Sequence, residues 1–91
     1  MSEGAFVSYY KNGQLKSKET YENRKENGLY ETYHANGQLE SKVNYKDGKQ
    51  DGLSEQYYYT GPLKSKGSYK KGKLEFRKEF HEDGQLKERR N

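Results

Sequence analysis

The two histidines are the only side chains of this sequence that ordinarily titrate near neutral pH, which makes them the first candidates for chemistry. His34 and His81 are far apart in the chain and stand where similar stretches carry Tyr10 and Tyr58. A position shared by Tyr and His is typical of an amphipathic packing role. We therefore expect both histidines to be structural rather than a metal pair.

No set of residues has the spacing of catalytic machinery. The sequence holds no nucleophile with a nearby base, no paired acids at a useful spacing and no phosphate-binding loop. The absence of cysteine excludes disulfides and thiolate metal sites, and it leaves the redox compartment open. We therefore expect a protein that is not an enzyme and that needs no metal or cofactor.

One short stretch, residues 34–39 (HANGQL), recurs along the chain and organises it. Related stretches lie at 10–15, 58–63 and 81–86, and their glycines are 24, 24 and 23 residues apart. Asn-Gly between two alternating runs is a strong hairpin signal, because both residues tolerate positive φ. A fixed period of this size predicts a repeat array of one supersecondary unit.

The period predicts a single repeat domain over 4–90, with units at 4–27, 28–51, 52–73 and 74–91. Within a unit, period-two alternation and many tyrosines favour short β-strands over helices. The predicted fold is all-β, an antiparallel meander of about four β-hairpins in a single twisted sheet, with polar loops between hairpins. We expect eight strands, near 5–10, 14–21, 29–34, 38–45, 53–58, 62–69, 76–80 and 84–89.

The register of each hairpin depends on its turn. A two-residue Asn-Gly turn places Tyr10 opposite Leu15, whereas a three-residue loop with Gly in the left-handed region places Tyr9 there. We favour the second, because it collects most apolar residues on one face. That face holds Val7, Tyr9, Leu15, Tyr21, Leu29, Tyr33, Leu39, Val43, Tyr45, Leu53, Tyr57, Leu63, Tyr69, Phe76, Phe80 and Leu86.

Composition limits the other function classes. Leu, Val and Phe together fall below the roughly 20% at which disorder becomes the default, but ten tyrosines in register with the repeat argue against disorder. The net charge is +4, with both signs interspersed. No apolar run is long enough for a transmembrane helix and no signal-peptide pattern is visible, so the compartment stays open, with the cytoplasm as the default expectation.

The repeating pattern resembles a known family. Residues 28–39 (GLYETYHANGQL) and 45–53 (YKDGKQDGL) look like the bacterial variant of the MORN repeat, found in small proteins often labelled antitoxin-like. The resemblance implies a β-hairpin solenoid with a binding or scaffolding role and no catalytic set. The chain departs from the pattern at Pro62, in a shorter fourth unit with Phe76 in place of Leu, and in a first loop without Asp-Gly.

The face opposite the apolar set is the candidate binding face. It combines rings with a column of cations, and its residues are Phe6, Tyr10, Lys18, Tyr30, His34, Lys42, Tyr58, Lys66 and Arg89. We expect a protein partner. The alternative is an anionic surface, either single-stranded nucleic acid or acidic phospholipid headgroups, met by charge and stacking. The structural alternative is a solvated face whose lysines keep an open sheet soluble.

The first predicted strand, 5–10, is apolar and has no neighbour on its outer side within the chain. Edge strands of this kind tend to pair with another chain. We expect this edge to pair either with a second copy of the chain, by self-association, or with further repeats upstream of it.

Overall fold

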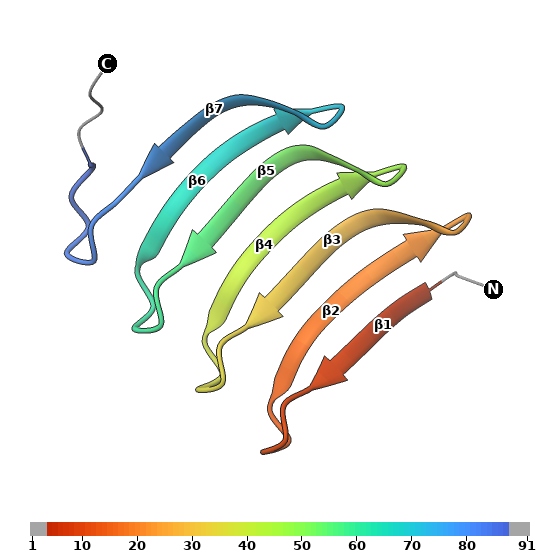
Figure 1. The fold of residues 1–91 in the computed structure, drawn as a ribbon, viewed down its shortest axis with the longest axis horizontal. Helices are drawn as coiled ribbons and strands as arrows, with labels where there is room; N and C mark the ends of the chain where they lie inside the picture. Colours follow the sequence, from red (N-terminus) through yellow and green to blue (C-terminus); the bar gives the residue numbers. More distant parts are fainter. Residues whose placement is uncertain (1–3, 88–91) are drawn as a thin grey trace.

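The computed structural model describes residues 4–87, and regular structure in this range is one seven-stranded antiparallel sheet. Each strand pairs with its neighbours in sequence, which is a meander (Figure 1). The predicted all-β repeat sheet is therefore confirmed. The strands are β1 (Gly4–Tyr9), β2 (Leu15–Glu22), β3 (Lys25–Tyr33), β4 (Leu39–Lys46), β5 (Lys49–Tyr57), β6 (Leu63–Lys70) and β7 (Lys73–Glu79).

The eighth predicted strand is not a strand over the described residues. Only one bridge, between Phe80 and Leu86, follows β7 in the part of the chain that the structure describes. The end of the predicted range 84–89 lies outside the described residues.

The turns with the Asn-Gly pattern are three-residue loops. The backbone N–H of Tyr10 donates to the carbonyl of Gln14 at 2.8 Å, and Gly13 has a φ of 89°. Tyr9 consequently pairs with Leu15, and the equivalent pairs recur in the next two hairpins. This confirms the preferred register at the turns, because a glycine in the left-handed region is what such a loop requires.

The links between hairpins are tighter than the expected polar loops. They are two-residue turns at Asn23-Arg24, Asp47-Gly48 and Lys71-Gly72, with positive φ at both positions of each. Positive φ at both central residues defines the type I′ turn, whose twist matches that of the flanking strands. The expectation of longer loops is wrong, because the charged residues after each turn extend the following strand.

A bulge divides the apolar residues between the two faces of the sheet. In β2, Leu15 pairs with Tyr9 but Ser17 pairs with Ser8, so Lys16 is an extra residue without a partner of its own. The residues after the bulge change face relative to a regular strand. The expectation of one apolar face is therefore wrong. One face of the sheet carries Tyr21, Val43, Tyr45 and Tyr69, and the other face carries Val7, Leu29 and Leu53.

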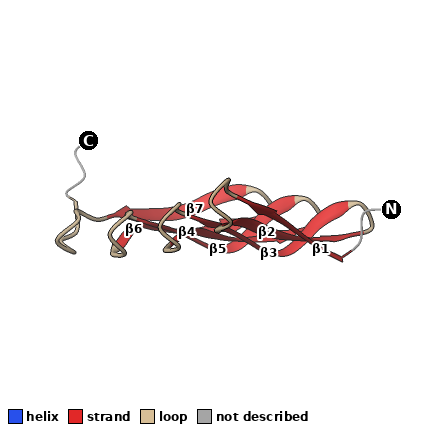
Figure 2. Cartoon of the chain, turned by 90° about the horizontal axis from the view of Figure 1, so that it is seen from below, coloured by secondary structure: helices blue, strands red, loops and turns tan. Residues whose placement is uncertain are grey.

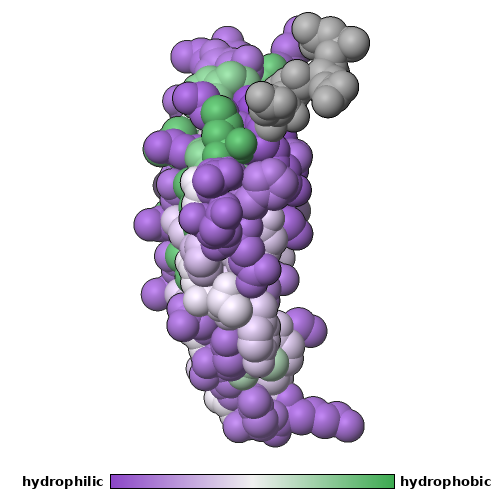
Figure 3. All heavy atoms as spheres, turned by 90° about the vertical axis from the view of Figure 1, so that its left-hand side faces the viewer, coloured by the Kyte–Doolittle hydropathy of each residue, from purple (hydrophilic) through white to green (hydrophobic). Residues whose placement is uncertain are grey.

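The sheet is a single layer (Figure 2) with extents of 45 × 35 × 14 Å. Among the described residues, no apolar side chain is fully buried, whereas Ser65 is only 5% exposed. Seen from the side, the surface is largely hydrophilic (Figure 3). Strand-to-strand contacts, rather than a core between layers, therefore hold the chain together.

We name the two faces by their residues. The serine face carries Ser8, Ser17, Thr32, Ser41, Gln56 and Ser65 in one row across the strands. The leucine face carries Val7, Leu29 and Leu53 together with Lys18, Lys42 and Lys66.

Candidate functional site

The predicted binding face does not exist as one surface. Lys18 pairs with Val7, and its counterparts Lys42 and Lys66 also lie on the leucine face. Phe6 and Tyr30 both pair with Glu19 and lie on the serine face. The prediction of a shared Lys and ring surface is wrong, because the bulge that follows each Asn-Gly turn was not included in it. Arg89 lies outside the described residues.

Tyr10, His34 and Tyr58, also predicted for that face, sit at the turns and link neighbouring units. The Tyr10 hydroxyl donates to the Tyr33 carbonyl at 2.7 Å, and the Tyr58 hydroxyl donates to the Phe80 carbonyl at 2.6 Å. His34 Nε2 lies 3.0 Å from the Tyr57 carbonyl oxygen. Each ring thus bonds to the corresponding place in the next unit, which confirms the structural role predicted for His34.

In each of the three hairpins, the extra residue at the bulge lies next to the ring at the turn. Lys16 and Lys64 lie over the Tyr10 and Tyr58 rings, with Nζ 5.6 and 5.7 Å from the ring centres. In the middle hairpin the ring is His34, and Glu40 approaches its Nδ1 at 3.9 Å. A cation suits the face of a tyrosine, and a carboxylate suits an imidazole.

The leucine face has a row of charges that crosses the sheet. Direct cross-strand neighbours in this row are Val7, Lys18, Glu31, Lys42, Glu55, Lys66 and Lys78. Opposite charges that face each other across strands attract weakly, and like charges repel. The row alternates in sign as far as Lys66, and only its last step, Lys66 to Lys78, joins like charges.

Two tyrosines fix the acidic residues of this row. The Tyr57 hydroxyl donates to Glu55 Oε1 at 3.0 Å, and the Tyr33 hydroxyl donates to Glu31 Oε1 at 3.3 Å. Partial burial, together with the adjacent carboxylate, raises the pKa of both tyrosine hydroxyls above its usual value. Both groups therefore act as neutral donors at physiological pH.

Beside the charges, the leucine face exposes apolar side chains. The exposed fractions are 49% for Val7, 39% for Leu29, 46% for Leu53 and 47% for Phe76. Isolated exposed apolar residues need no explanation, but Leu29, Leu53 and Phe76 stand at the equivalent position of three successive units on one face. A repeated apolar position of this kind makes the face a candidate interaction surface.

The serine face has a row of hydroxyl groups and two aromatic pairs, Phe6–Tyr21 and Tyr30–Tyr45. Hydroxyl contacts of 2.5 Å for Ser8–Ser17 and 2.6 Å for Thr32–Ser41 link adjacent strands. Near this row, Glu26 lies against Glu19, and burial followed by the hydrogen bond and the charge of Glu19 raises the pKa of the Glu26 carboxyl. A shallow hollow of about 140 Å³ opens farther along this face, near Tyr69.

The edge formed by the two-residue turns is basic. A second hollow lies there, and its lining holds more cations than anions: Lys25, Lys46, Asp47, Lys49, Asp51, Lys70 and Lys71. This edge was not predicted from the sequence, because these segments were expected to be loops. The signal was present, since lysines cluster around every Asp-Gly or Lys-Gly turn.

Residues 4–87 contain no cluster of three or more His, Asp or Glu side chains that suits a metal ion. Within the same residues no helix has the length and apolar character needed to cross a membrane.

The chain matches a family model four times, at residues 2–23, 26–47, 50–71 and 77–91, and the model describes the MORN repeat variant. Searches of curated proteins and of solved structures gave no match. MORN repeats are generally found in binding or scaffold modules and are generally non-catalytic. The four matches cover most of the chain in the same succession as its hairpins, and the chain belongs to the MORN repeat variant family.

Proposed function

We propose that this chain is a non-enzymatic interaction module whose leucine face binds a protein partner. The observation that supports this most directly is the exposed apolar row, Leu29, Leu53 and Phe76, on one side of a sheet over which the described residues place no second layer. Apolar groups provide most of the free energy of such an association, at about 25 cal/mol per Å² buried. The charge row beside them selects a partner with the complementary order of charges.

A photo-crosslinking experiment tests this proposal. A crosslinking amino acid placed at position 53 faces the leucine side, and the same amino acid at position 8 faces the serine side in the first unit. We expect a discrete adduct from position 53, and the purified partner should lose at least about tenfold in affinity for a Leu29→Ser/Leu53→Ser variant. Equal affinity of the folded double variant would contradict the proposal.

The specific form of this proposal is an antitoxin-like role in a bacterium, in which the partner is the product of an adjacent gene. It is supported by the family resemblance, which is an analogy and not a feature of the site. A pull-down of the purified neighbouring gene product with the folded chain tests it. Failure to retain that protein would remove this form while leaving the general proposal in place.

A second candidate function, binding of an anionic surface, is favoured by the basic turn edge rather than by the predicted Lys and ring face. Lys25, Lys46, Lys49, Lys70 and Lys71 gather there from successive units. Single-stranded oligonucleotides and anionic phospholipid vesicles should bind at low salt and dissociate at high salt. A Lys46→Glu/Lys70→Glu variant should lose this binding, and absence of binding at low salt would exclude the function.

Self-association through residues 5–10 stays a prediction. The strand β1 pairs with β2 on one side, and its six residues are all exposed. Light scattering over a range of protein concentrations tests it.

A further inference from the structure

The serine face repeats a pair of rings in its first two units, and the third unit lacks one of them. Phe6 packs against Tyr21 with ring centres 5.4 Å apart, and Tyr30 lies 6.1 Å from Tyr45. The third unit keeps the second ring as Tyr69, but the place of Phe6 and Tyr30 is taken by Ser54. The place of that ring beside Tyr69 is open, and it is bordered by Leu74, which pairs with Tyr69.

The neighbouring strand leaves this space open. Gly67 pairs with Ser54, at the position where the previous units have Glu19 and Val43. A Cβ on Gly67 would lie 2.9 Å from the carbonyl oxygen of Phe76, so the backbone of β7 excludes a side chain there. The result is the hollow of about 140 Å³, with the Gly67 backbone beneath it.

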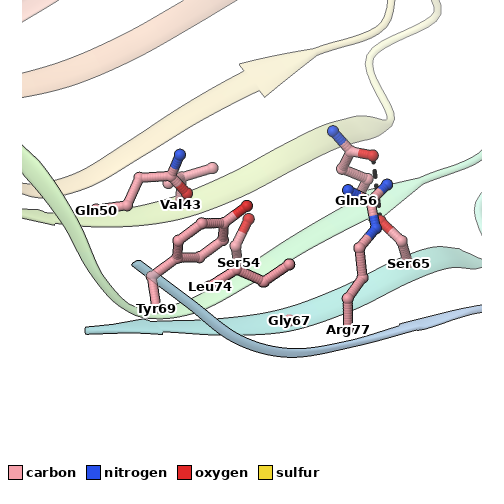
Figure 4. A pocket seen from close by; sticks show the side chains of 9 residues that line it. All are labelled: Val43, Gln50, Ser54, Gln56, Ser65, Gly67, Tyr69, Leu74 and Arg77. Carbon is pink, nitrogen blue, oxygen red and sulfur yellow. Dashed lines mark hydrogen bonds between the residues drawn. The ribbon is translucent and has the colours of Figure 1, made fainter. Parts of the chain in front are cut away.

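The hollow has an apolar end and a polar end (Figure 4). Val43, Tyr69 and Leu74 lie at one end together with the Gln50 amide, whereas Gln56 and Arg77 lie at the other. The Ser65 hydroxyl donates to Gln56 Oε1 at 3.1 Å, which orients the amide. Arg77 Nε lies 3.3 Å from Glu79 Oε2, and that contact occupies one of the five N–H donors of the guanidinium.

We propose that this hollow binds the C-terminal aromatic residue of a partner protein. The ring takes the place of the missing ring against Tyr69, and the terminal carboxylate meets the Arg77 guanidinium. A cavity of about 150 Å³ accommodates a benzene ring, so this space holds one side chain, and a single residue must supply both the ring and the charge. A guanidinium matches a carboxylate in both charge and shape.

This inference rests on the proposed protein-binding function, but it concerns the opposite face of the sheet. Substitutions at adjacent positions can test the two faces separately, because Leu53 belongs to the leucine face and Ser54 to the serine face. A failure of one proposal is therefore distinguishable from a failure of the other.

Four probes test the ligand chemistry in NMR titrations of the ¹⁵N-labelled full chain. They are N-acetyl-phenylalanine, its amide, a tetrapeptide that ends in Phe with a free carboxylate, and the same tetrapeptide amidated. We expect shifts of the Ser54, Gly67 and Arg77 amides, with millimolar affinity for the single residue, as an open site of this size allows. The tetrapeptide acid should bind more tightly than the single residue, and each amide should bind at least fivefold more weakly than its acid.

Variants test the site itself. Ser54→Tyr restores the ring that Tyr30 supplies one unit earlier, so it should weaken binding of the tetrapeptide acid more than tenfold while leaving the melting temperature unchanged or higher. Arg77→Gln should remove the preference for acid over amide, and Glu79→Gln should strengthen binding, because it removes a competing carboxylate. Leu53→Ser, on the other face, should leave the affinity unchanged.

Three results would overturn the inference. The first is equal binding of the tetrapeptide acid by Ser54→Tyr and the wild type. The second is equal binding of acid and amide probes by the wild type. The third is binding of N-acetyl-phenylalanine without binding of the tetrapeptide acid, which would assign the hollow to free aromatic acids instead of a protein terminus.

Discussion

At the scale of single residues, the units are joined by side chains that reach from one turn to the next. Tyr10, His34 and Tyr58 each contact a backbone carbonyl of the following unit. These contacts supplement the backbone ladder at the side of the sheet where the three-residue loops lie. These rings, predicted from the sequence to belong to a binding face, are therefore part of the scaffold.

Removing the hydroxyl of Tyr10 or Tyr58 should lower the stability of the chain without changing its fold. Tyr58→Phe loses the bond to the Phe80 carbonyl and leaves that oxygen to water, so we expect a loss of about 0.5–1.5 kcal/mol in the free energy of unfolding. Urea denaturation followed by circular dichroism measures this loss. Tyr59→Phe is the matched control, because Tyr59 is 57% exposed and its ring contact with His34 does not need the hydroxyl.

The Glu19 and Glu26 pair should make stability depend on pH. Because the pKa of Glu26 is raised in the fold above 4.5, ionisation of this group opposes folding. The penalty is absent well below pH 4.5, grows as the pH rises from there through the higher folded value, and is complete above it. Glu26→Gln should therefore stabilise the chain at pH 7, by about 0.5 kcal/mol or less because the group is largely solvated.

Thermal melts at pH 7 and at low pH test this expectation. The variant and the wild type should differ at pH 7 and converge at low pH, where Glu26 is protonated in both the folded and unfolded wild type. A difference that grows as the pH falls would show the opposite sign of linkage.

At the scale of the strands and turns, two kinds of turn alternate and only one of them was recognised from the sequence. The Asn-Gly loops and their register were predictable, because glycine in the left-handed region leaves few geometries. The bulges at Lys16, Glu40 and Lys64 were not, because the alternation of Leu39, Ser41 and Val43 continues unbroken through the bulge. One extra residue per hairpin was enough to divide the predicted binding face.

The turn at Asn23-Arg24 offers a test of the positive φ angles assigned to the two-residue turns. Arg24 has a φ of 67°, whereas the equivalent positions in the next two turns are Gly48 and Gly72. A residue with a side chain is destabilised by about 1–2 kcal/mol in the left-handed region. Glycine avoids this cost, but it loses more conformational entropy on folding, which cancels part of the gain. Arg24→Gly should raise the free energy of unfolding by about 0.5–1 kcal/mol in chemical denaturation.

The reverse substitution is its control. Gly48→Arg places a side chain at a φ of 83° and should destabilise the chain by a similar amount. Stabilisation by Gly48→Arg would contradict the assignment of these turns to type I′.

The hollow near Tyr69 shows why the rest of the candidate site escaped the sequence analysis. Ser54 interrupts a position held by Phe6 and Tyr30, and Gly67 interrupts a strand, so both signals were present in the repeat alignment. The sequence did not show the strand pairing that brings Ser54, Gly67 and Arg77 into one row. Cross-strand neighbours depend on bulges, and a single sequence marks bulges weakly.

At the scale of the whole molecule, the chain is a plate and not a globule. Its radius of gyration is 14.6 Å, compared with about 12 Å for a compact chain of this length. Over the described residues each strand pairs only with its neighbours in sequence, so stability is close to a sum of neighbour terms.

This architecture predicts graded protection along the sheet. Amide hydrogen exchange should be slowest in β3, β4 and β5, which lie farthest from the two edges of the sheet, and fastest in the edge strands β1 and β7. Exchange measured by mass spectrometry with peptide resolution tests this gradient. Uniform protection of all seven strands would indicate a global unit, or an additional chain that covers both edges.

The alternating charges on the leucine face have a consequence for how such a chain changes its length. Adding or deleting two strands together keeps every Lys beside a Glu, whereas gaining or losing one strand brings two lysines, or two glutamates, side by side. Duplication in whole hairpins therefore has no electrostatic cost, and duplication in halves does. The charge row already contains one pair of like charges, Lys66 and Lys78, because Lys78 stands where the earlier units have Glu31 and Glu55.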